Sequence, residues 1–89
     1  MTIAPRADEV RRLVARNFRD LGVPVFNLAD LHETVLVERR RCIARTYRAG
    51  PLMAMWMLDV GLVQFYDDEG NMLRTVNLFE QARTDRAAA

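Results

Sequence analysis

The chain has 89 residues, of which 51% are hydrophobic and 28% are charged, and its formal net charge is +1. This length allows one small core, and the composition is that of a folded soluble domain, which excludes an intrinsically disordered chain. The longest apolar run, over 52–58, is too short to cross a bilayer, and the first residues have no signal-peptide pattern, so we expect a cytoplasmic protein without a membrane contact.

Two absent residue types narrow the chemistry. The sequence has no serine and no lysine, so all thirteen basic residues are arginines, as the codons of a GC-rich genome favour. Serine nucleophiles and lysine Schiff bases are therefore excluded. The single cysteine, Cys42, cannot form an internal disulfide.

An amphipathic helix is predicted over residues 8–21. Its apolar residues recur at helical spacing and form one stripe: Val10, Leu13, Val14, Phe18 and Leu21. Asp8 or a slightly earlier residue is placed to cap the first turn, and Gly22 followed by Pro24 is typical of a helix end.

The connector over residues 22–33 is expected to include a single helical turn. Asn27 is a candidate N-cap for this turn, which would run to His32. We expect Val25, Phe26 and Leu28 to pack the connector against the core.

Strand-like alternation begins at Thr34 and predicts five strands, over residues 34–38, 42–48, 52–59, 62–67 and 72–78. The clearest turn is "DDEGN", in which Asp67 opens a tight hairpin and Gly70 supplies its left-handed residue. Short connections between consecutive strands favour a five-stranded antiparallel meander. With the N-terminal helix packed on one face of the sheet, the fold class is α+β. We expect one domain over 1–80 and a flexible or frayed tail over 81–89.

Strand register divides the apolar residues between the two faces of this sheet. A turn at Gly61 with two residues at its tip would place Leu58 opposite Val63 and Trp56 opposite Phe65. The next turn would place Phe65 opposite Leu73. The face toward the helix then carries Leu52, Ala54, Trp56, Leu58, Val63, Phe65 and Leu73. The opposite face carries Met53, Met55, Met57, Leu62, Tyr66, Met72 and Val76, with Gln64 and Arg74 among them.

The second face is too apolar for a sheet surface left to water, and methionine is typical of adaptable contact surfaces. The leading hypothesis is therefore a non-enzymatic, homodimeric protein-interaction module. Its dimer or partner interface would consist of Met53, Met55, Met57, Tyr66 and Met72. Two alternatives stay open: the tail or the connector covers these residues, or the face binds an apolar ligand or a metal.

Catalytic and metal-binding patterns are weak. His32 and Cys42, near Asp30, would form a nucleophilic pair only if they were in contact, and a buried thiol with a surface imidazole explains the same residues. The spacing of a zinc site, the alternating ligands of a calcium loop and a glycine-rich phosphate loop are all missing from the sequence. We expect no catalytic residue, metal or cofactor.

A group of arginines supports an alternative function, nucleic-acid binding through an arginine-rich hairpin and the arginine-lined face of the N-terminal helix. Three of them are expected at a hairpin tip and two on the strand that follows: Arg39, Arg40, Arg41, Arg45 and Arg48. Clustered arginines bind phosphates, and Tyr47 is placed to stack on a base. Acidic neighbours such as Glu33 and Glu38 and the small net charge count against this function.

Overall fold

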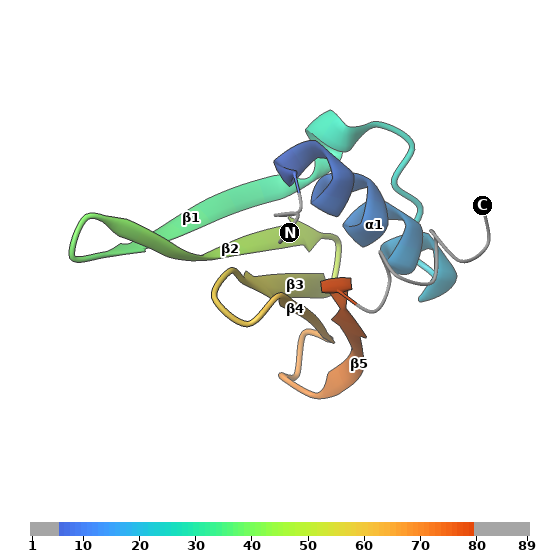
Figure 1. The fold of residues 1–89 in the computed structure, drawn as a ribbon. Coiled ribbons are helices and arrows are strands. Elements are labelled where there is room, and N and C mark those ends of the chain that lie inside the picture. The colour runs from blue at the N-terminus through green and yellow to red at the C-terminus, as the bar shows by residue number, and fades with distance from the viewer. Residues whose placement is uncertain (1–5, 80–89) are drawn as a thin grey trace.

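The computed structural model describes residues 6–79, which form a helix packed on one face of a five-stranded sheet (Figure 1). The elements are α1 (Ala7–Asp20), the 3-10 turn η1 (Leu28–Asp30), β1 (His32–Glu38), β2 (Arg41–Ala49), β3 (Leu52–Met57), β4 (Leu62–Tyr66) and β5 (Met72–Asn77). All neighbouring strands are antiparallel and follow chain order, which confirms the α+β meander. The predicted tail over 81–89 lies outside the described residues.

The apolar stripe of α1 is buried as its spacing predicts. Val10, Val14 and Phe18 are at most 1% exposed. The helix begins one residue earlier than expected, and its N-cap position is Arg6, before Asp8. The Arg6 side chain makes no capping hydrogen bond, so the expected side-chain cap is absent. At the other end Gly22 has φ +99°, and its amide donates to the Arg19 carbonyl at 3.0 Å, which closes the helix with a left-handed residue.

The connector forms the expected single turn, but it buries fewer side chains than predicted. The Asn27 side chain accepts a hydrogen bond of 3.0 Å from the Ala29 amide, which confirms it as the cap of η1. Val25 is buried, whereas Phe26 is 88% exposed and Leu28 is also exposed, so the predicted packing of these two residues is wrong. The turn is only three residues long, and Leu31 after it enters the core instead.

The helix-facing side of β3 and β4 carries the core that the alternation predicts. Four residues, not two, separate β3 from β4, so Trp56 lies opposite Val63 and Ala54 opposite Phe65. This register differs from the prediction by an even number of residues, and the two faces therefore stay as predicted. Phe18 of α1 packs edge-on against Phe65, with ring centroids 5.8 Å apart.

The face assignment on β5 is wrong beyond Met72. Tyr66 lies opposite Met72 as expected, but Phe65 lies opposite Arg74 because Leu73 is an extra residue in a β-bulge. One extra residue exchanges the faces of everything that follows it. Leu73 is therefore 44% exposed, while Arg74 and Val76 lie on the helix side, where Val76 packs against the core.

The hairpin between β4 and β5 has the predicted chemistry. Asp67 Oδ1 accepts hydrogen bonds of 2.9 Å from the amides of Glu69 and Asn71, and Gly70 has φ +84°. The bonds from Asn71 lower the pKa of Asp67 below its usual value. None of the helices within residues 6–79 has the length and apolar character that crossing a membrane requires.

Candidate interaction surfaces

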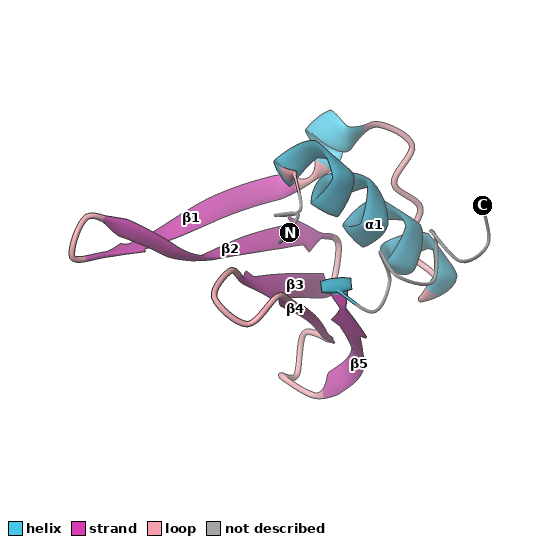
Figure 2. Cartoon of the chain, in the orientation of Figure 1, coloured by secondary structure: helices cyan, strands magenta, loops and turns pink. Residues whose placement is uncertain are grey.

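The methionine face, defined as Met53, Met55, Met57, Tyr66 and Met72, lies on the side of the sheet away from α1. Burial alternates along β3, where Leu52, Ala54 and Trp56 are buried and the three methionines between and after them are half-buried. Figure 2 shows the helix on one side of the sheet. Within residues 6–79, no helix or strand packs on the other side, so these methionines are screened only by their neighbours in the sheet.

One row of side chains crosses three strands of this face. Met53 lies opposite Tyr66, and Tyr66 lies opposite Met72, so the predicted residues of β3, β4 and β5 are brought together. The Tyr66 hydroxyl donates a hydrogen bond of 2.7 Å to Oε1 of Gln64. Met72, at the sheet edge, is 58% exposed.

The row ends at a shallow hollow of about 330 Å³. Met53 and Tyr66 line it together with Arg48, Pro51 and Asp68, so its lining includes both apolar and charged side chains. The hollow extends the methionine face toward the turns that precede β3 and follow β4.

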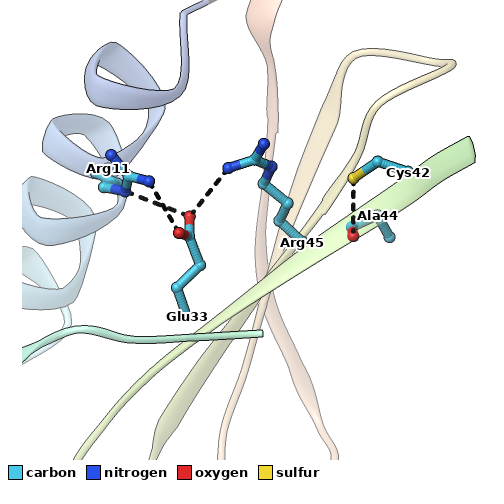
Figure 3. Close-up of polar contacts among 5 residues, drawn as sticks. All are labelled: Arg11, Glu33, Cys42, Ala44 and Arg45. Atoms are coloured by element: carbon cyan, nitrogen blue, oxygen red, sulfur yellow. Dashed lines mark hydrogen bonds and ion pairs between the residues drawn. The ribbon is translucent and has the colours of Figure 1, made fainter. Parts of the chain in front are cut away.

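A charged cluster on the helix side joins α1 to β1 and β2 (Figure 3). The Arg11 guanidinium donates to both Glu33 oxygens, with Nη2 2.9 Å from Oε1 and Nε 3.3 Å from Oε2. Arg45 Nη1 lies 3.6 Å from Glu33 Oε2, and its guanidinium carbon lies 5.9 Å from the centre of the Trp56 ring. The cluster thus uses one carboxylate to hold two arginines from different layers.

The cluster also changes the acidity of its members. Hydrogen bonds from Arg11 hold the pKa of the Glu33 carboxyl below its usual value, against the opposing effect of burial. Burial, reinforced by the Glu33 carboxylate, raises the pKa of Tyr47. Tyr47 Oη, Arg45 Nε and Trp56 Nε1 are buried and make no hydrogen bond of ordinary geometry within the described residues. Because the cluster connects α1 to β1 and β2, we interpret it as a structural link between the helix and the sheet.

The predicted arginine tip is present. Glu38 lies opposite Arg41, so Arg39 and Arg40 are the two residues of a tight turn, and both have positive φ, at +50° and +65°. Such a turn favours Asn-Gly, because left-handed backbone is strained for residues with a side chain. All three tip arginines are exposed, and Arg41 Nη2 lies 3.9 Å from Asp59 Oδ1.

The other two predicted arginines do not join this tip. Arg45 points to the helix side and is held by Glu33, while Arg48 is exposed on the methionine side, opposite Met53. Arg48 lies seven positions after Arg41 along the strand, which places their backbones roughly 20 Å apart. Tyr47 is fully buried, so the prediction that it serves as a stacking platform is wrong: its position in the strand faces α1.

The structure keeps His32 and Cys42 apart. His32 lies opposite Arg48 and Cys42 lies opposite Val37, so about 17 Å of strand separates them. The Cys42 thiol lies 3.7 Å from the carbonyl oxygen of Ala44. Within residues 6–79, no three side chains of His, Cys, Asp or Glu gather closely enough to hold a metal ion.

Sequence reasoning missed one surface, the projecting hairpin of β1 and β2. Val35, Leu36, Val37 and Ile43 are between 37% and 64% exposed there. In Figure 1 the hairpin extends beyond the rest of the sheet, with its tip far from α1. The available signal was the run "TVLV", which is apolar on both faces of a strand with only one covered side.

Comparison with known proteins gives no relative. No family model matches the chain, and no curated protein or solved structure matches it either. Function is therefore inferred from the surfaces above.

Proposed function

We propose that this chain is a non-enzymatic, homodimeric protein-interaction module that binds a second copy of itself through the methionine face. The observation that carries the proposal is the row of Met53, Tyr66 and Met72 beside Met55 and Met57, on the side of the sheet away from α1. Flexible thioethers pack against irregular surfaces, and a small domain gains stability when it buries such a face.

The geometry of the face suits a symmetric contact. Methionines of β3 lie in the middle strand of the sheet, so two copies stacked face to face bring these side chains to the centre of the interface. The polar groups nearby are Gln64, which already accepts from Tyr66, and Arg48 at the rim. An apolar centre with a polar rim is the usual anatomy of a protein interface.

The test is the mass in solution of the wild type and of Met55→Asp, measured by light scattering over a range of concentrations. A carboxylate at the centre of the face is costly to bury, so we expect a wild-type dimer and, at low concentrations where the wild type is still dimeric, a folded Met55→Asp monomer. Val60→Asp is the matched control, because Val60 is 54% exposed in the loop between β3 and β4. A wild type that is monomeric at every concentration contradicts the proposal.

A second candidate function, nucleic-acid binding, is supported by the strained tip. Arg39 and Arg40 occupy backbone positions where asparagine and glycine are more stable, and such strain is found at functional positions. Binding through phosphates should weaken steeply with salt and be lost when Arg39, Arg40 and Arg41 are all changed to alanine. The same three changes at Arg12, Arg16 and Arg19 on the exposed face of α1 test whether the helix face takes part in this binding.

A further inference from the structure

The two edges of the sheet differ in how they are protected from pairing. On β5 the edge strand carries the bulge at Leu73, and Arg74 points inward to the Asn17 side chain. Bulges and inward charges are the devices by which edge strands avoid a partner. On β1 the register shift places its extra residue, Ile43, on the inner strand β2, so β1 itself runs without interruption for seven residues.

Within residues 6–79, the backbone of β1 presents a regular set of unpaired amides and carbonyls to the outer side of the sheet. The amide of Leu58 donates to the carbonyl of Ile43, so Ile43 faces β3, and Ala44, the next residue along, faces β1. Ala44 is paired with Leu36, which therefore faces β2. By alternation the amides and carbonyls of Glu33, Val35 and Val37 point away from the sheet.

We propose that the β1 strands of two copies pair antiparallel about a two-fold axis at Val35, which joins two sheets into one of ten strands. In this register Val35 meets Val35, Glu33 meets Val37 and Thr34 meets Leu36 of the second copy. The outward groups then form about six backbone hydrogen bonds. Val35 is then covered by its counterpart, and Leu36 and Val37 lie beside Thr34 and Glu33 of the second copy.

Charge complementarity selects this register and a second copy as the occupant. The same axis places His32 opposite Glu38 of the second copy, and beyond the strand it places the tip residue Arg40 opposite Asp30 of η1. An axis one residue away, at Thr34, would instead place Glu38 opposite Asp30 of the second copy, and two carboxylates would face each other. The strand is therefore complementary to itself, as a two-fold contact requires.

The edge contact is independent of the methionine face and compatible with it. Its two-fold axis is perpendicular to the sheet, so both methionine faces lie on the same side of the joined sheet. Face-to-face stacking uses an axis in the plane of the sheet, and two perpendicular two-fold axes generate a closed tetramer where they intersect. We expect edge pairing, which buries the smaller area, to be the weaker contact, so wild-type dimers should become tetramers as concentration rises.

The first experiment measures mass by light scattering in the Met55→Asp protein, in which only the edge contact remains. Adding Val35→Lys should abolish the concentration-dependent dimer, because it places two lysines against each other at the axis. Ile43→Lys is the matched control, since Ile43 is 37% exposed on the same hairpin but not on the edge strand. Association that survives Val35→Lys overturns the edge proposal, whereas a mass unaffected by Met55→Asp overturns the proposed function instead.

A charge exchange tests the register. His32→Asp alone should weaken edge pairing about tenfold, because the new carboxylate faces Glu38 of the second copy, and adding Glu38→Lys should restore it. The two residues lie at opposite ends of β1, so rescue cannot occur within one chain. Failure of the double variant to recover overturns the register.

Cross-linking gives a second measurement that does not depend on weakened association. In a Cys42→Ala background, the double variant Thr34→Cys, Leu36→Cys should oxidise to a covalent dimer. Residues 34 and 36 of the two copies form non-hydrogen-bonded pairs, in which the Cβ atoms are close enough for a disulfide. Neither single cysteine should cross-link, since each faces a residue without a thiol. A covalent dimer from Thr34→Cys alone would overturn the axis at Val35.

Discussion

The guanidinium of Arg74 on β5 donates a hydrogen bond of 2.6 Å to Oδ1 of Asn17 on α1. Asn17 is buried, and its amide group donates in turn to the Leu13 carbonyl at 2.8 Å. Arg74 Nη1 also lies 3.7 Å from a carboxylate oxygen of Asp20. The bulge at Leu73 thus aims an edge-strand charge at the one buried polar side chain of α1.

The first prediction removes this donor. Arg74→Met keeps much of the aliphatic cover but leaves the Asn17 oxygen buried without a partner, so we expect the free energy of unfolding to fall by about 1–2 kcal/mol. Urea denaturation followed by circular dichroism measures it. Arg19→Met, at an exposed position of α1, should change stability by less than about 0.5 kcal/mol. Equal effects of both changes would contradict the role of Asn17.

The second prediction concerns Glu33, which pairs with Arg11 and Arg45. Glu33→Gln weakens both ion pairs, and because the arginines are partly exposed the loss near pH 7 should be about 1–2 kcal/mol. The pKa of Glu33 is lower in the folded chain than its ordinary value of 4.5. Its contribution is therefore complete above that value and is lost as the pH falls through the folded-state pKa.

The measurement is the difference in unfolding free energy between wild type and Glu33→Gln at a series of pH values. The difference should be largest near pH 7 and shrink as the pH falls below 4.5 and through the folded-state pKa of Glu33. The pKa of Asp67 is also lowered on folding, but Asp67 is present in both proteins and cancels in the difference. A difference that does not change with pH would show that Glu33 acts through packing alone.

Local pattern predicts most of this fold, and its failure on β5 has an identifiable physical cause. The helix stripe, the cap at Asn27 and the faces of β3 and β4 depend on spacing along a short segment, and the sequence is sufficient for them. The bulge at Leu73 depends on pairing between strands, and one unforeseen residue inverted the faces of Arg74 and Val76.

Some candidate surfaces likewise follow from local alternation, and others depend on contacts between residues far apart in the sequence. The methionine face follows from alternation within β3 and was predictable residue by residue. The Glu33 cluster joins residues 22 positions apart, and no local pattern selects Arg11 or Arg45 as its partner among many arginines. The open edge of β1 emerged only once the sheet order was established, because any of the predicted strands is apolar enough to be internal.

The third prediction tests strain at the hairpin tip. Arg39→Asn with Arg40→Gly gives the residues that a two-residue turn with positive φ favours, so the free energy of unfolding should rise by about 1–2 kcal/mol. Arg41→Gly, at a strand position, should lower it by about 0.5–1 kcal/mol. Urea midpoints measure both. No gain from the double change would show that the tip is relaxed and would remove the support that strain gives to nucleic-acid binding.

The fourth prediction compares two glycines with left-handed backbone. Gly61 has φ +66°, and a Cβ there would lie 2.5 Å from the Phe79 ring, whereas Gly70 has φ +84° and nothing within 4 Å of such a Cβ. Gly70→Ala bears only the backbone cost, about 1 kcal/mol. Gly61→Ala bears this cost and also displaces the ring, which should add about 1–3 kcal/mol.

Phe79→Ala separates the two costs at Gly61 by a double-mutant cycle. With the ring removed, Gly61→Ala should cost no more than Gly70→Ala, so the coupling between positions 61 and 79 equals the steric part of the penalty. Phe79 follows the amide of Leu78, which donates to the Gly61 carbonyl at 2.8 Å and fixes the segment after β5 against the loop before β4. Additive effects of the two changes would mean that the ring moves aside freely, and that the hydrogen bond rather than the packing of Phe79 holds this segment in place.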